Sequence, residues 1–429
     1  MRTASVLIVA LFTIGTASFP TSAADRPPNI LLIMADDVGV DAIGCYGGTS
    51  HKTPHIDALA KSGLRFNHGY SMPVCHPTRT TLLTGRYPFR QKHPRWGSFP
   101  KSDEKHTVAH FLKRAGYATA IAGKWQLTLQ KNDPLHPQRL GFDDSCVFGW
   151  HEGPRYYDPM IYQNGKLRTD TKGKYGPDLY VQFLSDFMQA NRKKPFFAYY
   201  SMALCHDVTD DLKGPVPYAP GKSHFDTYAE MMAQMDKHVG QIVKAVDDLG
   251  LRENTVILFT GDNGTSKNSI HEYKDGKYVR VPVYSMFKGK KVRGGKGDLT
   301  NGGTNVPLIA NWKGTIKPGQ VVDDLVDFSD WLPTCVDLAG AKVPTGLQID
   351  GQSFAVRLRA NKPAPRKWAY AERGKKRWWV RTQRWKLYSD GELFDVASDP
   401  REKSAITQET RESAAARKRL EKALSAVRH

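Results

Sequence analysis

The chain has 429 residues, of which 40% are hydrophobic, and it carries a formal net charge of +19. A chain of this length and apolar content can bury a large hydrophobic core, so we predict a globular protein with one large domain and a smaller appended one. The charge predicts attraction to anions such as nucleic acid, anionic lipid or an acidic polymer, although a basic surface that serves only solubility is an equal alternative.

The first 24 residues have the pattern of a secretory signal peptide. Arg2 precedes an apolar run at residues 6–14, and small residues end the segment at Ala24. A retained membrane anchor is the alternative, but the run is well short of the about 20 residues that span a bilayer. We therefore expect an exported protein, periplasmic or extracellular, without stable membrane insertion. Export, and the lack of any known nucleic-acid-binding motif, argue against nucleic acid as a partner.

Four apolar runs have the length and the polar ending of buried parallel strands. They occupy residues 29–37, 117–125, 195–206 and 255–264. Helical periodicity appears between them, at residues 107–115, 176–190 and 228–249. This alternation predicts an α/β fold with a large, mostly parallel sheet sandwiched by helices, in which ligands bind outside the carboxyl ends of the strands.

The residue composition and the pattern of apolar runs change after Pro344. Residues 367–396 contain short aromatic-rich runs separated by glycine and charged pairs, which predict a small antiparallel sheet. An amphipathic helix is expected at residues 412–427. We therefore divide the chain into a signal peptide at 1–24, a main domain at 25–343 and a C-terminal subdomain at 344–429.

Two pairs of polar residues close predicted strands: Asp36 with Asp37, and Asp262 with Asn263. In a parallel sheet both pairs point into one crevice, and their oxygen atoms are hard ligands that suit Ca²⁺ or Mg²⁺. The alternative for either pair alone is a turn or a helix cap. Two pairs at equivalent strand ends favour the metal site.

Cys75 is the least expected residue near such a site, because soft sulfur is a poor ligand for a hard cation. Oxidation of its side chain to an aldehyde removes the conflict, since the hydrate of the aldehyde offers one oxygen to the metal and one for attack. The other four cysteines allow up to two disulfides in any of three connectivities. They are Cys45, Cys146, Cys205 and Cys335.

The stretch "CHPTR" at residues 75–79, followed by "LLTGR" at 82–86, resembles the signature of the type I sulfatases, in which this cysteine becomes formylglycine. The resemblance extends over nearly the whole chain, because "AGKW", "TGDNG" and "GGKGDLTNGGTNVPLIA" occur in family order. It implies an alkaline-phosphatase-like fold. It also implies Ca²⁺, with Mg²⁺ less favoured, bound by Asp36, Asp37, Asp262, Asn263 and an oxygen of modified Cys75.

The same resemblance implies roles for four further side chains. Arg79 would stabilise the nucleophile, Lys124 and Lys296 would contact the sulfate, and His206 would protonate the leaving alcohol. Each of these residues could instead have a role outside catalysis: the arginine could pair with a carboxylate, the lysines could be solvated surface residues, and the histidine could be structural. Gln126 departs from the family, which commonly has histidine there. Glutamine can orient the hydrate by hydrogen bonds but cannot exchange a proton near neutral pH.

Residues 267–296 carry nine Lys or Arg against two acids, with interleaved tyrosines. We interpret this segment as a loop beside the site that grips a polyanionic chain, the alternative being a disordered basic insert. The expected partners are a sulfated carbohydrate or another sulfate ester, and a formylglycine-generating or other sulfatase-maturing enzyme. Two other functions stay open: hydrolysis of phosphate esters or phosphonates, and binding of sulfated glycans without catalysis.

Overall fold

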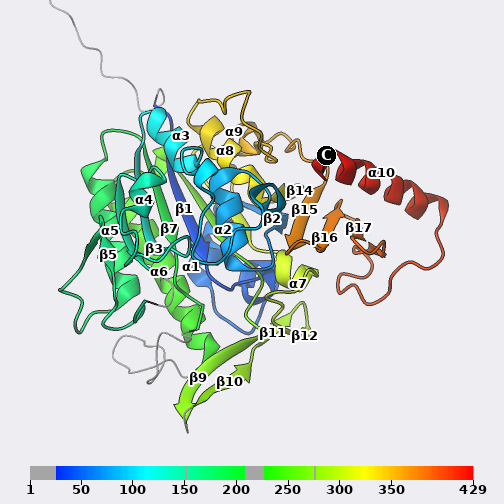
Figure 1. The fold of residues 1–429 in the computed structure, drawn as a ribbon, viewed down its shortest axis with the longest axis horizontal. Helices are drawn as coiled ribbons and strands as arrows, with labels where there is room; N and C mark the ends of the chain where they lie inside the picture. The colour runs from blue at the N-terminus through cyan, green and yellow to red at the C-terminus, as the bar shows by residue number, and fades with distance from the viewer. Residues whose placement is uncertain (1–25, 150–151, 208–226, 275–276, 429) are drawn as a thin grey trace, which may run out of the picture.

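A computed structural model describes residues 26–149, 152–207, 227–274 and 277–428. The predicted signal peptide lies outside these residues. One sheet of ten strands forms the centre of the molecule (Figure 1). In spatial order its strands are β14 (Gln320–Asp327), β2 (Leu64–Tyr70), β13 (Leu308–Asn311), β8 (Thr255–Gly261), β1 (Asn29–Ala35), β7 (Phe196–Ser201), β3 (Ala118–Lys124), β4 (Asp144–Phe148), β5 (Tyr162–Gln163) and β6 (Lys166–Leu167).

The central strands β8, β1, β7, β3 and β4 are parallel to their neighbours within this group. β13, β5 and β6 pair antiparallel, and β14 pairs parallel with β2 at the edge. All four predicted strands lie in the parallel centre. Their apolar runs are buried on both faces, as sheets covered by helices require. The predicted mostly parallel α/β sheet is confirmed.

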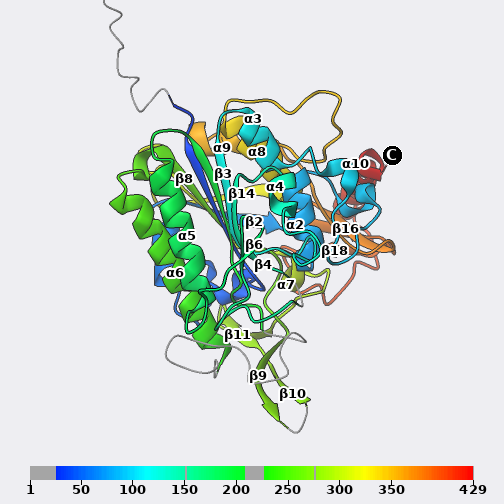
Figure 2. The same ribbon diagram turned by 60° about the vertical axis from the view of Figure 1, so that its left-hand side comes forward.

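Helices cover both faces of the sheet (Figure 2). Along β1, Leu31 and Ile33 pack into one core, whereas Ile30 and Leu32 pack into the other, because successive side chains of a strand point to opposite faces. One face is covered by α1 (Pro54–Lys61), α5 (Gly176–Ala190) and α6 (Tyr228–Asp248), and the other by α2 (Cys75–Thr84), α3 (Val108–Arg114), α8 (Trp331–Leu338) and α9 (Ala355–Ala360). The helices predicted at 107–115, 176–190 and 228–249 correspond to α3, α5 and α6.

A second sheet and a long helix form the C-terminal part of the chain. The sheet contains β15 (Ala369–Arg373), β16 (Arg377–Arg381), β17 (Trp385–Tyr388) and β18 (Leu393–Asp395), and the helix is α10 (Arg411–Arg428). All four strands are antiparallel, as their aromatic-rich sequence predicts. Phe354 and Leu358, which lie in the segment before this sheet, pack in the core of the main sheet. The division of the chain at residues 343 and 344 stays a prediction.

The basic segment at 267–296 is not the loop that we expected from its charge. It forms two hairpins: β9 (Asn268–Lys274) with β10 (Lys277–Pro282), and β11 (Tyr284–Phe287) with β12 (Lys290–Arg293). Figure 1 shows the first hairpin projecting from the molecule, whereas the second lies against it, where Phe287 bridges to Gly48. Lys288 and Gly289 both have positive φ, of 48° and 75°, which is the backbone of a tight hairpin turn. The apolar and aromatic run at 281–287, before that Lys-Gly pair, is a strand signal, whereas the charged residues at 290–293 after the pair give none.

All five cysteines are free, so the disulfides that the sequence allowed are absent from the described residues. Cys146 and Cys205 belong to the core on one face of the sheet, whereas Cys335 belongs to the core on the other. Their burial as small apolar side chains explains their presence without cross-links.

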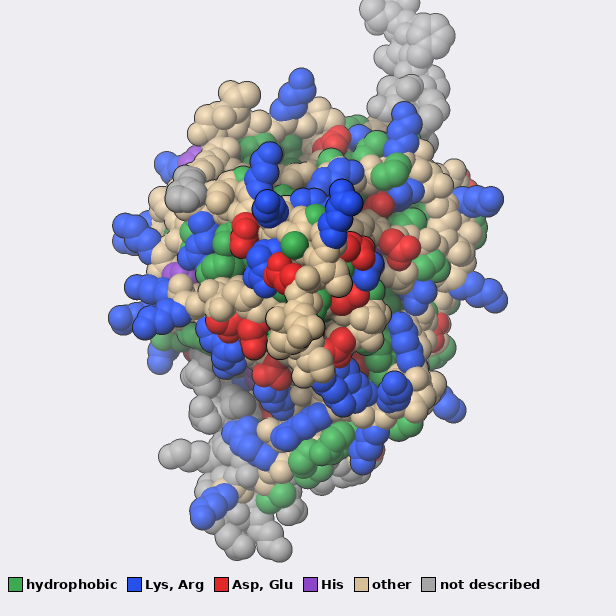
Figure 3. All heavy atoms as spheres, turned by 90° about the vertical axis from the view of Figure 1, so that its right-hand side faces the viewer, with side chains coloured by type: hydrophobic (Ala, Val, Ile, Leu, Met, Phe, Trp, Pro, Cys, Tyr) green, Lys and Arg blue, Asp and Glu red, His purple; other side chains and the backbone are tan. Residues whose placement is uncertain are grey.

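Among the residues that the structure describes, no helix has both the length and the apolar character needed to cross a bilayer. On the side of the molecule that carries α10, Lys and Arg side chains are spread widely, and acidic side chains gather nearer the centre (Figure 3). The net charge therefore does not by itself identify one binding surface on this face.

Arg366 joins the segment before the C-terminal sheet to the main body through buried charges. Its guanidinium donates to Asp330 at 2.5 Å and lies 3.0 Å from an oxygen of Asp327, and the three side chains are at most 1% exposed. Removing one partner of a buried ion pair leaves an uncompensated charge, which costs about 3–5 kcal/mol.

We therefore expect Arg366→Met to lower the free energy of unfolding by about 3–5 kcal/mol, measured by urea denaturation. The control is Lys244→Met, which removes an exposed pair with Asp248 on α6 and should cost less than about 0.5 kcal/mol. Similar losses in both variants would contradict the assignment of a structural role to the buried pairs.

Candidate functional site

The carboxyl ends of β1 and β8 place four polar side chains together. Ala35 pairs with Gly261 in the parallel register, so Asp36 and Asp37 follow one strand at the level where Asp262 and Asn263 follow the other. All four residues are fully buried. The Asn263 side chain donates to Asp37 Oδ1 at 2.8 Å, and the Asp37 backbone N–H donates to Asp262 Oδ1 at 3.1 Å. The two strand-end pairs thus form one cluster.

Cys75 is the first residue of α2 and closes this cluster from above the strand ends. Its thiol donates to Asp36 Oδ1 at 3.3 Å and to Asp37 Oδ1 at 3.7 Å. Ligand atoms of Asp36, Asp37, Cys75 and Asp262 all lie within 4.8 Å of one another. Burial and the neighbouring carboxylates raise the pKa of the thiol well above its usual value.

Asp37 has a left-handed backbone with φ of 61°, which is uncommon for a residue other than glycine. The Tyr228 hydroxyl on α6 donates to the Asp37 carbonyl at 3.0 Å. Together with the bond from the Asp37 N–H to Asp262, this contact fixes both backbone polar groups of the residue. Such conformations persist where the surroundings impose them, and they cluster at functional sites.

Three cationic side chains contact the three carboxylates: Lys124 and Arg79 are buried, whereas the Lys296 side chain is 21% exposed. Lys124, at the end of β3, donates to Asp36, and Lys296 donates to Asp37 at 2.7 Å. Arg79, one turn after Cys75 on α2, donates to Asp262 at 2.8 Å. The carboxylates and cations balance, so a bound divalent cation would make the cluster net positive and attract an anion.

These charges act differently on the three carboxyl groups. Burial opposes ionisation of Asp36 and Asp37, but nearby cations, Lys124 for the first and Lys296 for the second, outweigh it and lower both pKa values. For Asp262, burial and the negative charge of Asp36 outweigh Arg79 and raise the pKa to about 6.

His206 lies beside the cluster, after the end of β7. Its Nδ1 is 2.6 Å from the Asp207 carbonyl oxygen, which makes Nδ1 the donor, and its Nε2 is 3.9 Å from Asp37 Oδ2. The Tyr156 hydroxyl donates to the carbonyls of Ala203 and His206 and so holds the backbone of this turn. Burial, with the positive charge of Lys296, lowers the pKa of His206 to about 3.

Gln126 follows β3, and it differs from the other expected site residues. The side chain is fully buried, yet neither its oxygen nor its nitrogen has a hydrogen-bond partner among the described residues. A buried amide without partners is costly. This side chain is therefore available to a bound group, and its part in chemistry stays a prediction.

Ser201, at the end of β7, is a site residue that the sequence did not reveal. Its hydroxyl accepts a hydrogen bond from Arg79 Nη1 and donates to the Lys124 carbonyl at 2.8 Å. It therefore holds two of the cationic residues in place. A single serine at a strand end has no distinguishing local pattern, so only the adjacency of β7 and β3 identifies it.

The donor atoms fit a hard divalent cation. Three buried carboxylates lie together, and Asn263 Oδ1 is a buried acceptor without a donor among the described residues. Oxygen ligands of this kind suit Ca²⁺ or Mg²⁺. A thiol does not complete such a set, whereas an oxygen at the Cys75 side chain would.

Comparison with known proteins gives a consistent result. A family model described as Sulfatase matches residues 28–341, and one described as N-sulphoglucosamine sulphohydrolase, C-terminal, matches residues 298–429. N-acetylgalactosamine-6-sulfatase of Canis lupus familiaris is 31% identical over 80% of this chain and 68% of its own length. Arylsulfatase A of Homo sapiens is 32% identical over 80% of this chain and 70% of its own length.

Among solved structures, Ps i-CgsB has a TM-score of 0.75 and 26% identity, over 94% of this chain and 92% of that one. The same protein in complex with k-i-k-neocarrahexaose has a TM-score of 0.73 and 25% identity over the same shares. The fold and the sequence therefore point to the same group of proteins.

The carboxylate cluster predicts that Ca²⁺ binds and stabilises the protein. We expect addition of Ca²⁺ to chelator-treated protein to raise its Tm, because an ion that binds only the folded state stabilises that state. Asp262→Asn should abolish both the Tm increase and the binding heat measured by calorimetry.

Asp248→Asn, on the exposed face of α6, is the matched control and should bind Ca²⁺ as the parent does. If neither Ca²⁺ nor Mg²⁺ changes the Tm or gives a binding heat with the parent protein, the cluster is not a metal site.

Proposed function

The chain belongs to the sulfatase family, whose members hydrolyse sulfate esters, and from this premise we propose that its substrate is a sulfated carbohydrate. Two neighbours support this substrate class: N-acetylgalactosamine-6-sulfatase, by its name, and Ps i-CgsB, by its complex with a neocarrahexaose. The observation that carries the proposal is the position of Cys75 among buried carboxylates and cations.

We propose that Cys75 is converted to formylglycine by a formylglycine-generating or other sulfatase-maturing enzyme. The hydrate of that aldehyde would supply an oxygen nucleophile and an oxygen ligand where the thiol now lies. Ca²⁺ held by Asp36, Asp37, Asp262 and Asn263 would supply a positive charge that stabilises the charge of the reacting sulfate group. Mg²⁺ is the less favoured alternative.

The remaining residues position and neutralise an anion. Arg79 is held by Ser201 and Asp262, which fixes its guanidinium against the carboxylate cluster, and there it would stabilise the nucleophile. Lys124 and Lys296 would bind the sulfate oxygens, and fixed cations in a buried site stabilise developing charge without reorganisation. Gln126 would orient the hydrate through its unpartnered amide.

His206 would protonate the leaving alcohol, which requires that the negative charge of the bound substrate raise the pKa of the ring from about 3, so that Nε2 carries a proton. The Nδ1 of His206 is held as a donor by a backbone carbonyl, which leaves Nε2 on the side of Asp37 and the cluster. This geometry fixes which ring nitrogen exchanges the proton.

Two alternative functions are less well supported. In a phosphate-ester or phosphonate hydrolase, the position of Cys75 would hold a nucleophile that needs no conversion. A glycan binder without catalysis would not need Arg79, Lys124, His206 and Lys296 around the cysteine.

We also infer that residues 25–343 carry the chemistry, that residues 344–429 form an appended subdomain, and that residues 1–24 direct export to the periplasm or the extracellular space.

Mass spectrometry of the peptide that contains Cys75 tests the proposed nucleophile. We expect the mass loss of a thiol-to-aldehyde conversion in active protein, and loss of activity on 4-nitrophenyl sulfate in Cys75→Ala. Cys45→Ala, outside the cluster, should keep activity. An unmodified thiol in fully active protein would exclude this mechanism.

A second experiment tests His206. His206→Gln should lower kcat/KM for a sugar sulfate by about 10²–10⁴-fold, the usual contribution of a general acid. The loss on 4-nitrophenyl sulfate should be small, because nitrophenolate leaves without protonation. His106→Gln serves as the control, since its Nδ1 lies 3.2 Å from the Ser102 carbonyl oxygen in an exposed contact outside the cluster. Equal losses on both substrates would assign His206 a structural role instead.

A further inference from the structure

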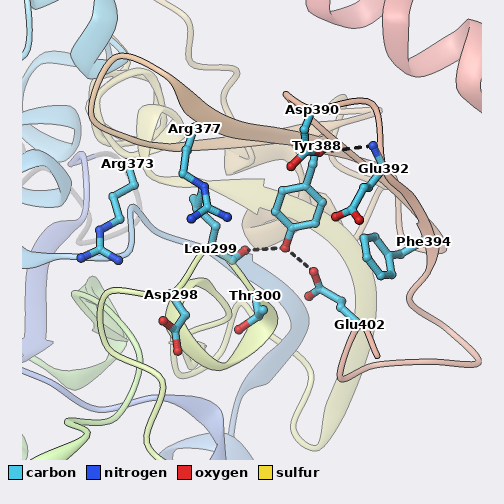
Figure 4. Close-up of a pocket in the computed structure, with 10 residues that line it drawn as sticks. All are labelled: Asp298, Leu299, Thr300, Arg373, Arg377, Tyr388, Asp390, Glu392, Phe394 and Glu402. Atoms are coloured by element: carbon cyan, nitrogen blue, oxygen red, sulfur yellow. Dashed lines mark hydrogen bonds between the residues drawn. The ribbon is translucent and has the colours of Figure 1, made fainter. Parts of the chain in front are cut away.

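A cavity of about 230 Å³ lies between the loop after Lys296 and the C-terminal sheet (Figure 4). Roughly 300–1,000 Å³ is usual for sites that enclose a drug-sized ligand, so this cavity suits one small unit. Its lining comes from two parts of the chain: Asp298, Leu299 and Thr300 from the loop, and Arg373, Arg377, Tyr388, Asp390, Glu392, Phe394 and Glu402 from the C-terminal part. None of these residues belongs to the carboxylate cluster.

The loop at Gly297 connects the wall of the cavity to the candidate site. The Gly297 N–H donates to the Pro73 carbonyl at 2.8 Å, two residues before Cys75, and its carbonyl accepts a hydrogen bond from Arg373. Lys296, the preceding residue, contacts Asp37. Gly297 therefore links Lys296, which we propose binds the sulfate, to the Arg373 guanidinium.

Arg373 and Arg377 form a directly opposed pair across the β15–β16 hairpin. Directly opposite side chains of an antiparallel pair lie on one face, where two like charges repel each other. Figure 4 shows both guanidinium groups extending toward the same side of the cavity. Arg373 uses one nitrogen for the Gly297 carbonyl, and Arg377 has no hydrogen bond or ion pair within the described part of the chain. Both side chains are exposed, so water can solvate their unused N–H groups, and an anion between them would reduce the repulsion and form charge-assisted hydrogen bonds.

The other walls do not compete for these arginines. Tyr388 donates to the Leu299 carbonyl at 3.2 Å and also to Glu402, whose other oxygen accepts from buried Lys386 at 2.9 Å. Asp298 is paired with Lys267 at 2.6 Å. Asp390 and Glu392 lie on the side of the cavity opposite the arginines in Figure 4, where carboxylates can accept hydrogen bonds from sugar hydroxyls.

We propose that this cavity binds the saccharide unit next to the one that carries the scissile sulfate, and that Arg373 and Arg377 bind an anionic group on that unit. The inference rests on the proposed function, since it extends the substrate from one sulfated sugar to a chain with a second negative charge. The anionic group is a carboxylate or a second sulfate, both of which match the planar, forked donors of arginine.

Arg377 is the diagnostic residue, because Arg373 also holds the loop that carries Lys296. The test compares the parent with Arg377→Ala on three disaccharides that share a terminal 6-sulfated N-acetylgalactosamine. Their second sugar is neutral, a uronic acid, or sulfated. We expect the parent to prefer one or both anionic neighbours, and we expect Arg377→Ala to lose about tenfold in kcat/KM on those substrates alone.

Lys375→Ala is the matched control, because Lys375 lies in the same turn and carries the same charge but does not line the cavity. 4-Nitrophenyl sulfate, which has no neighbouring sugar, should be hydrolysed equally by the parent, Arg377→Ala and Lys375→Ala. The identity of the preferred neighbour distinguishes a carboxylate from a sulfate as the bound group.

Binding of the same disaccharides to Cys75→Ala protein, measured by calorimetry, tests the cavity without turnover. A preference for an anionic neighbour that disappears in the Cys75→Ala, Arg377→Ala double variant supports the proposal. Equal affinity for all three disaccharides, or equal losses in Arg377→Ala and Lys375→Ala, overturns it. A parent protein that hydrolyses no sulfate ester while keeping this binding preference overturns the proposed function and leaves the binding site supported.

Discussion

The structure depends on the burial of three carboxylates at the ends of two adjacent parallel strands. Removing Asp36, Asp37 and Asp262 from water is costly, and unpaired they would not stay ionised there. Lys124, Lys296 and Arg79 compensate this cost by direct contact. A site built in this way holds charged groups in fixed positions before any ligand arrives, which is the condition for stabilising charge during a reaction.

The scaffold around the cluster explains how these positions are maintained. The parallel register of β1 and β8 sets the strand ends level, and the start of α2 brings Cys75 over them. Tyr228 and Ser201 then hold the Asp37 backbone and the Arg79 side chain. Each contact comes from a different element of the main sheet or its helices, so the geometry of the centre is a property of the whole domain.

The C-terminal sheet has a different relation to the centre. It contributes no side chain to the carboxylate cluster, but its first hairpin reaches the Gly297 carbonyl beside Lys296. Under the proposed function, the chemistry and the recognition of a neighbouring sugar belong to separate parts of the chain that meet at one loop. Residues of the hairpin would then be able to change the substrate preference without disturbing the buried charges.

Local sequence patterns determined the fold class and most of the centre. Apolar runs ending in Asp36 and Asp262 predict parallel strands that open into one crevice, and the motif from Cys75 to Arg79 identifies the cysteine, because both signals lie within a few residues. Local patterns did not determine both hairpins within 267–296, because the charged residues at 290–293 give no strand signal. Only the tertiary structure revealed Ser201, and it alone placed Arg373 and Arg377 beside the loop of Lys296. Those positions arise from pairing between segments distant along the chain, which no local period or motif encodes.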